Sequence, residues 1–379
     1  MKNLYYFMLV LAVAFLSPNR LASQNTVESS FNFEGLNRTY RLYVPASYSP
    51  QQSVPLVINL HGYGSNNLEQ EQYGDFRPIA DTAGFLVVHP NGTLDFNNVM
   101  HWNTFGTSTV NDVGFLSALI DTLASHYQID LSRVYSTGMS NGGFMSYSLA
   151  CSLSGKIAAV ASVTGTMTTP NFLTCNPGRP IPVMHIHGTA DATVPYNGNA
   201  FFVSVPSIVS NWVAVNQCNP EAVFNQLPDI DNTDGCTAEH YLYADGEAGV
   251  AVEHYKIIGG GHSWPGAPVN INITNMDFSA SKVIWQFFKK FNLSGLISTS
   301  ETYAGASVTI SPNPSGGIFQ VQTDEQLIGY VEVMDARGSL CLREQVVSNH
   351  FTINLPVAGL YFLKLQTKSG YQLSKLVVK

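Results

Sequence analysis

One serine lies in a glycine-rich motif of the kind that presents a nucleophile. Residues 138–142 form a G-x-S-x-G pattern directly after an apolar run at residues 134–137. In a tight strand-to-helix turn, a side chain in place of either glycine would collide with its neighbours. Ser140 would project from the strand end at a helix N-terminus, where backbone N–H groups stabilise negative charge. The pattern predicts a nucleophile; the alternative is a glycine-rich turn in which Ser140 only caps the helix.

Two other strand ends offer the base and the carboxylate that a serine nucleophile needs. An apolar run at residues 183–187 leads through Gly-Thr-Ala to Asp191, and a run at residues 255–258 leads through three glycines to His262. The chain order Ser, Asp, His is one in which catalytic triads occur. We therefore expect His262 to take the proton of Ser140 and Asp191 to orient the imidazole.

The other histidines and aspartates are weaker candidates for these roles. His185 and His187 alternate on a predicted strand, which favours core or supporting positions, and Asp191 is preferred to Asp229 and Asp231. The two histidines lack an accompanying H-E-x-x-H motif, and residues 229–235 miss the register of a calcium loop. We expect no metal and no cofactor.

The segment at residues 59–64, at the end of the predicted strand 56–60, is expected to help form an oxyanion hole. The backbone N–H groups of Tyr63 and of Asn141, the residue after the nucleophile, are the predicted donors. Three ring side chains are expected to contact substrate: His61, Trp102 and Trp264. The two tryptophans could stack an aromatic acyl group or a sugar ring, or could equally be packing residues.

Strand and helix patterns alternate between residues 38 and 292. Helices are predicted at residues 112–123, with Asp112 as the N-cap, 141–153 and 279–291. Strands are predicted at residues 38–44, 56–60, 85–89, 134–137, 157–163, 183–187 and 253–258. Continuous apolar strands separated by helices predict an α/β fold with a mostly parallel sheet covered on both faces.

Composition narrows the class of protein. The 379 residues carry a net charge of −8 and only 12% charged residues, so binding to nucleic acid is not expected. The 45% hydrophobic content excludes disorder. An apolar run of 13 residues at positions 4–16 is too short to span a bilayer and predicts a signal peptide over residues 1–23, cleaved near Ser23. We expect no stable membrane span.

Export makes the cysteines candidates for disulfides. Four of the five lie in the central region, and four cysteines allow three pairings. The two local pairings, Cys151 with Cys175 and Cys218 with Cys236, would close short loops. Cys341 is left over and is expected to be a small buried hydrophobic residue.

Four segments together resemble a group of secreted esterases that contains polyhydroxybutyrate depolymerases and feruloyl or acetylxylan esterases. The segments are residues 61–64, 138–143, 187–196 and 260–266, and the resemblance extends over about residues 31–293. It implies an α/β-hydrolase fold, the triad Ser140, Asp191 and His262, and the two local disulfides. At His101 the chain departs from relatives that have a cysteine there, so a disulfide seen in some members is not expected.

The composition changes after residue 293. Small residues at 294–307 predict a linker, and short alternating strands at 318–321, 330–334, 351–355, 360–365 and 373–378 predict a small all-β sandwich at 308–379. Motifs at 312–314, 335–338, 359–362 and 375–379 resemble the C-terminal sorting domain of the type IX secretion system. The alternative is a carbohydrate-binding module, but the aromatic residues alternate as core residues would.

These expectations define one predicted function. The chain would be a secreted or cell-surface serine carboxylic ester hydrolase, with the catalytic domain at 24–293, acting on feruloyl or acetyl esters of plant or algal polysaccharides. Its partners would be the ester substrate and the type IX secretion machinery. An extracellular poly(3-hydroxybutyrate) depolymerase is the alternative enzyme. A serine peptidase and a non-catalytic surface carbohydrate-binding protein are alternatives from other classes.

Overall fold

A computed structural model of the protein describes residues 25–379 apart from 270, 298–307, 324–326, 328–329, 336–338, 347 and 368–369. The chain divides into two units, residues 1–297 and 298–379. The predicted signal peptide lies outside the described residues, as does most of the predicted linker. The first linker residues were predicted wrongly, because β13 (Phe291–Asn292) and β14 (Gly295–Leu296) form a hairpin of the first unit.

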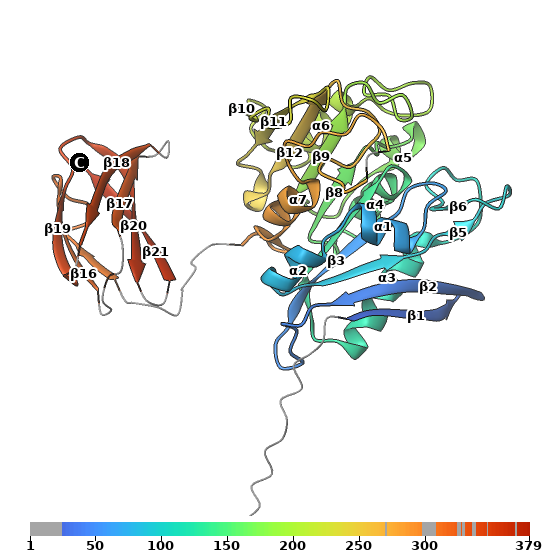
Figure 1. Cartoon of the computed structure of the whole chain (residues 1–379), viewed down its shortest axis with the longest axis horizontal. Coiled ribbons are helices and arrows are strands. Elements are labelled where there is room, and N and C mark those ends of the chain that lie inside the picture. The colour runs from blue at the N-terminus through green and yellow to red at the C-terminus, as the bar shows by residue number, and fades with distance from the viewer. Residues whose placement is uncertain are drawn as a thin grey trace, which may run out of the picture. The chain divides into compact units, whose positions relative to one another are not determined.

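The first unit is built on one ten-stranded sheet whose centre is parallel, as predicted. Pairing is parallel from β4 through β3, β7, β8 and β9 to β12, and antiparallel at both edges. Figure 1 shows β1 and β2 at one end of this sheet and β10 and β11 at the other. In spatial order the strands are β1 (Asn25–Phe33), β2 (Leu36–Val44), β4 (Leu86–Pro90), β3 (Val54–Leu60), β7 (Ile129–Met139), β8 (Ala159–Val163), β9 (Val183–Gly188), β12 (Val252–Ile258), β11 (Thr237–Tyr243) and β10 (Val223–Gln226).

Helices cover both faces of the sheet, which explains why the central strands are apolar at every position. In β3, Leu56 and Ile58 face one core while Val57 faces the other. The first core is closed by α3 (Asp112–His126), α4 (Asn141–Ser152) and α6 (Val205–Val215), and the second by α2 (Arg77–Ala83) and α7 (Ala280–Phe288). The remaining short elements are α1 (Asn67–Tyr73), β5 (Thr93–Leu94), β6 (Met100–His101), α5 (Thr169–Thr174) and the 3-10 turn η1 (Glu247–Gly249). Among the described residues, no helix has both the length and the hydropathy needed to cross a membrane.

A buried ion pair joins β2 to the start of α3. The guanidinium of Arg38 donates to the Asp112 carboxylate over 2.6 Å, and both residues are 2% exposed. The second carboxylate oxygen of Asp112 accepts the Asn103 N–H at 2.8 Å. Asp112 is therefore not the N-cap that the sequence predicted. Asn111 has that role, since its side chain accepts the N–H of Gly114.

We expect Asp112→Ala to lower the free energy of unfolding by about 3–5 kcal/mol, because it leaves the Arg38 charge buried without a partner. Urea denaturation measures this loss. The matched control on the same helix is Asp121→Ala, whose exposed pair with Lys156 should contribute less than about 1 kcal/mol. Equal losses for the two variants would contradict the assigned importance of the buried pair.

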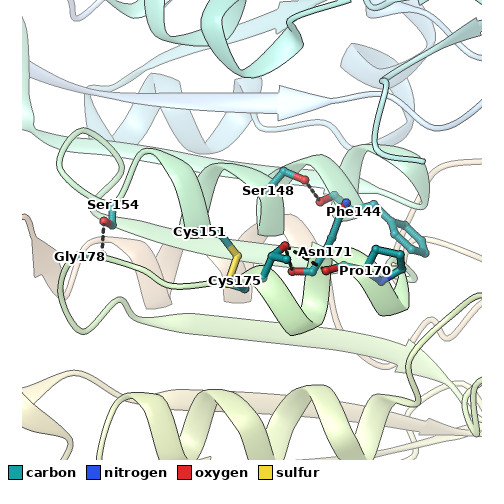
Figure 2. Close-up of a disulfide and its surroundings, with 9 residues drawn as sticks. Phe144, Ser148, Cys151, Ser154, Pro170, Asn171, Cys175 and Gly178 are labelled. Carbon is teal, nitrogen blue, oxygen red and sulfur yellow. Dashed lines mark hydrogen bonds between the residues drawn. A yellow bond between two sulfur atoms is a disulfide. The ribbon is translucent and has the colours of Figure 1, made fainter. Parts of the chain in front are cut away.

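One predicted disulfide is present and the other is not. Cys151 at the end of α4 is bonded to Cys175 after α5, with Cα atoms 5.0 Å apart (Figure 2). Cys218 and Cys236 are free and buried, so their predicted pairing was wrong. Cys218 lies beside Val250, before β12 begins, whereas Cys236 precedes Thr237, which is in register with Ile258 at the end of β12. The seven residues of β12 separate the two thiols by about 20 Å.

The second unit is the predicted β-sandwich of two antiparallel sheets. Phe319, Val333 and Leu363 lie in its core, which both sheets share. One expectation was wrong, because Cys341 is exposed. The expected alternation of aromatic residues holds for Phe319 and Tyr361, which are buried in the core, but Tyr330 and Phe362 are 47% and 37% exposed. One sheet holds β15 (Val308–Ser311), β16 (Ile318–Thr323) and β19 (His350–Asn354), and the other β18 (Leu340–Gln345), β17 (Tyr330–Asp335), β20 (Gly359–Thr367) and β21 (Gly370–Val378).

Candidate active site

Ser140 lies in a strained turn between β7 and α4. Its backbone has φ +53° and ψ −119°, a conformation that a non-glycine residue rarely adopts. A Cβ at Gly142 would lie 2.2 Å from the backbone oxygen of Leu60, and one at Gly138 would lie 2.6 Å from the same atom. Both motif glycines are thus required by close backbone packing. Ser140 occupies the N-cap position of α4, but among the described residues its side chain makes no capping hydrogen bond, so the hydroxyl is not used for capping.

Asp191 and His262 form a hydrogen-bonded pair on the loops that follow β9 and β12. The Nδ1 of His262 lies 2.7 Å from Oδ2 of Asp191. The other carboxylate oxygen accepts the N–H groups of Thr193 and Val194, each at 2.8 Å. Burial alone would raise the pKa of Asp191, but hydrogen bonds from His187 and His262 hold it well below its ordinary value. Asp191 is therefore an ionised acceptor that fixes the orientation of the His262 ring.

Ser140 and His262 line one cavity of about 390 Å³, on the side of the sheet where β3, β7 and β12 end. Apart from Tyr63, which was predicted through its backbone N–H, the sequence did not single out the other lining residues. Tyr63, Tyr73, Met139, Val269 and Ile271 give the cavity a largely aromatic and aliphatic wall. The only signal for Met139 was its place beside the nucleophile, and the alternating apolar residues after His262 could have indicated Val269 and Ile271.

The predicted oxyanion donors lie beside this cavity. A Cβ placed on Gly62 would lie 3.6 Å from Cβ of Ser140, so the backbone preceding Tyr63 passes close to the serine. Among the hydrogen bonds of the described residues, neither the Tyr63 N–H nor the Asn141 N–H donates to a protein acceptor. Two free N–H groups next to Ser140 are the arrangement that a developing alkoxide requires.

The ring residues predicted to contact substrate are instead packing residues. His61 and Trp102 are 0% exposed and Trp264 is 1% exposed. The indole N–H of Trp102 donates to the backbone oxygen of His61, and that of Trp264 donates to Ser281. Burial lowers the pKa of His61 to about 4, and its neutral Nε2 accepts the Gly92 N–H. These residues support the loops around the site but do not line the cavity.

Trp102 nevertheless acts on the site through Asn141. The Asn141 side chain accepts the backbone N–H of Trp102 at 2.6 Å and donates to the backbone oxygen of Trp102 and to Thr104. The amide thus ties the first residue of α4 to the segment at 102–104. This contact holds the backbone of Asn141, one of the two candidate oxyanion donors, in place.

A second, more open hollow lies beyond Thr104. It has a volume of about 980 Å³ and includes Phe105, Leu173 and Phe201, of which the last two are 75% and 73% exposed. Asn171, which also lines the hollow, donates to the backbone oxygen of Thr104. Asn141 also donates to Thr104, so Thr104 connects this exposed apolar surface to the candidate oxyanion donor Asn141.

The parallel sheet, the nucleophile turn and the Asp–His pair on later loops define an α/β-hydrolase. A solved structure titled acetyl xylan esterase from Aspergillus awamori shares this fold, with a TM-score of 0.51 at 16% sequence identity, covering 70% of this chain and 99% of that one. The family model described as esterase PHB depolymerase matches residues 38–173. A model described as secretion system C-terminal sorting domain matches residues 309–379.

Curated relatives agree with these matches. A probable feruloyl esterase C of Aspergillus clavatus is 31% identical over 204 residues, covering 50% of this chain and 70% of that protein. A bifunctional acetylxylan esterase/xylanase of Neocallimastix patriciarum is 28% identical over 284 residues, and the match covers 75% of this chain but 38% of that longer protein. The chain belongs to this family of α/β-hydrolase esterases, and its C-terminal unit is a secretion sorting domain.

Proposed function

We propose that the protein is a serine carboxylic ester hydrolase with Ser140 as nucleophile, His262 as general base and Asp191 as the group that orients the base. The observation that carries the proposal is the 2.7 Å contact between His262 and an ionised Asp191, with His262 and Ser140 lining one cavity. The strained backbone of Ser140 supports it, because such strain persists where the surrounding structure holds a functional residue in place.

In this mechanism Oγ of Ser140 attacks the ester carbonyl carbon while its proton passes to Nε2 of His262. The N–H groups of Tyr63 and Asn141 hold the alkoxide of the tetrahedral intermediate. The intermediate collapses, the bond to the alcohol oxygen breaks, and His262 returns its proton to the leaving alcohol. Water then attacks the acyl-serine by the same route and releases the acid.

Feruloyl or acetyl esters of polysaccharides are the substrates that the observations favour. Relatives are described as feruloyl and acetylxylan esterases, and the fold neighbour as an acetyl xylan esterase. The cavity of about 390 Å³ lies in the size range of small-molecule sites. Its wall of Tyr63, Tyr73, Val269 and Ile271 suits the flat phenolic ring of a ferulate.

A poly(3-hydroxybutyrate) depolymerase is the second candidate, because of one specific feature. The exposed Leu173 and Phe201 beside the site offer an apolar surface on which a polyester chain could lie. The family model that matches residues 38–173 is named for such an enzyme.

The C-terminal unit supports a proposal on location and partner. We infer that the type IX secretion machinery recognises the sandwich domain and delivers the enzyme outside the cell or to its surface.

The proposed function is tested by initial rates of the full chain on methyl ferulate, acetylated xylan and emulsified poly(3-hydroxybutyrate). We expect turnover of methyl ferulate or acetylated xylan to exceed that of the polyester. Preference for the polyester would make the depolymerase the correct assignment. Absence of hydrolysis on all three would favour a non-catalytic carbohydrate-binding protein.

A further inference from the structure

A buried row of side chains extends from Asp191 into the core, and the mechanism above does not use it. Oη of Tyr147 lies 2.7 Å from Nδ1 of His185. Nε2 of His185 lies 3.1 Å from Nδ1 of His187. Nε2 of His187 lies 2.8 Å from the backbone oxygen of Val194 and 3.2 Å from Oδ2 of Asp191. Tyr147, His185 and His187 are all 0% exposed.

With both rings neutral, the position of every hydrogen in this row follows from the end at Asp191. The Val194 oxygen and the Asp191 carboxylate can only accept, so Nε2 of His187 carries the hydrogen. In a neutral imidazole the other nitrogen then accepts, so Nδ1 of His187 takes a hydrogen from Nε2 of His185. Nδ1 of His185 is left as an acceptor for the Tyr147 hydroxyl. All hydrogen bonds of the row thus point toward Asp191.

Burial disfavours ionisation of His185 and Tyr147 in the row and of His254 beside it. Burial lowers the pKa of His185 far below its ordinary value and that of His254, on β12, to about 4. Burial raises the pKa of Tyr147, on α4, and of Tyr196, whose hydroxyl faces His254. Besides Asp191, the charged groups nearby are Lys256, in register with His187 on β12, and Glu239, with which Lys256 is paired at 3.2 Å.

We propose that His187 is a positioning residue for the candidate triad, oriented in turn by His185 and Tyr147. This inference rests on the proposed function, because it gives the row its effect through Asp191. Nε2–H of His187 is shared between the Val194 backbone oxygen at 2.8 Å and Oδ2 of Asp191 at 3.2 Å, and the same Oδ2 accepts the His262 N–H. The second donor fixes the carboxylate and draws part of its negative charge away from His262.

Weakening the row has two expected effects. The carboxylate becomes less well oriented, so kcat falls about three- to tenfold, the value of one net hydrogen bond, while KM stays unchanged. The His262 imidazolium gains a larger share of the Asp191 charge. The acid limb of the kcat/KM profile therefore moves to higher pH, by about half a pH unit.

The chain offers a matched pair of tyrosines for the experiment. Tyr147→Phe and Tyr135→Phe each remove a fully buried hydroxyl that makes one hydrogen bond, to His185 and to the backbone oxygen of Phe291 respectively. Both variants should show a similar fall in Tm, but only Tyr147→Phe should lower kcat and move the acid limb. If the wild type is active and the two variants have identical pH profiles, the positioning role is overturned but the proposed esterase function is not.

Two substitutions of His187 provide the conservative rescue. His187→Gln keeps an N–H near the place of Nε2, whereas in His187→Asn the amide is too short to reach Asp191. We expect His187→Gln to retain most of kcat and His187→Asn to lose it. The reverse order would contradict the proposal.

A spectroscopic measurement separates this proposal from the proposed function. In histidine-labelled wild-type protein at pH 7, ¹⁵N chemical shifts should report His185 and His187 as neutral rings with the hydrogen on Nε2. A hydrogen on Nδ1 of His187 would overturn the proposal whatever the activity. A wild type inert toward p-nitrophenyl acetate would refute the esterase mechanism, and the positioning role with it.

Discussion

Ser140→Ala is expected to lower kcat/KM for ester hydrolysis by at least about four orders of magnitude, since the acyl-enzyme can no longer form. The fold should be unaffected, because Ser140 makes no capping hydrogen bond and alanine keeps the Cβ that the turn already accommodates. Initial rates on methyl ferulate or p-nitrophenyl acetate, with Tm measured alongside, give the result.

The control for this variant lies two turns further along the same helix. Ser148 is half-buried, and its hydroxyl donates to the backbone oxygen of Phe144 at 3.2 Å (Figure 2). Ser148→Ala should keep wild-type kcat/KM with at most a small change in Tm. A Ser140→Ala enzyme within tenfold of wild type would show that another residue is the nucleophile.

The protein is expected to lose stability steeply as the pH falls from about 6.5, the ordinary imidazole value. Four histidines have folded pKa values below that: burial lowers those of His61 and His254 to about 4, that of His89 to about 3, and that of His185 further below the ordinary value. The unfolded chain therefore binds more protons in this range than the folded one. Each histidine contributes a slope of about 1.4 kcal/mol per pH unit, in the sense that lower pH favours unfolding.

Urea denaturation between pH 7.5 and 4.5 measures this slope. His89→Gln should reduce the slope by the contribution of one histidine. Because no ring nitrogen of His89 has a hydrogen-bond partner among the described residues, the substitution removes no hydrogen bond. His126→Gln changes an exposed histidine at the end of α3 and should leave the slope unchanged. A free energy of unfolding that is flat across this range would contradict the neutral burial of these rings.

The central strands and the nucleophile turn could be predicted because their signals are local. Apolar runs bounded by glycine mark β3, β7, β9 and β12, and the contacts of Gly138 and Gly142 are a property of the turn itself. The edge strands β1 and β10 were missed because they are largely exposed and polar, so they lack an apolar pattern.

The wrong predictions at the site and for the second disulfide concern contacts between distant segments. Trp102 and Trp264 follow strand ends in the way that substrate-contacting rings do, and only the packed structure shows that both are buried. Cys218 and Cys236 are 18 residues apart in sequence but lie at opposite ends of β12. The pairing depends on strand register, which composition and spacing do not determine.

The free thiols of Cys218 and Cys236 determine whether the disulfide between Cys151 and Cys175 can exchange. Burial raises the pKa of Cys218, and burial together with the hydrogen bond to Asp234 raises that of Cys236 to about 12. Thiol–disulfide exchange requires a thiolate that can reach a sulfur atom, and at neutral pH neither residue supplies one. Once the catalytic unit has folded, no other cysteine of that unit competes with the bond between Cys151 and Cys175. In an oxidising medium, the catalytic unit then keeps this one disulfide pairing without a disulfide isomerase.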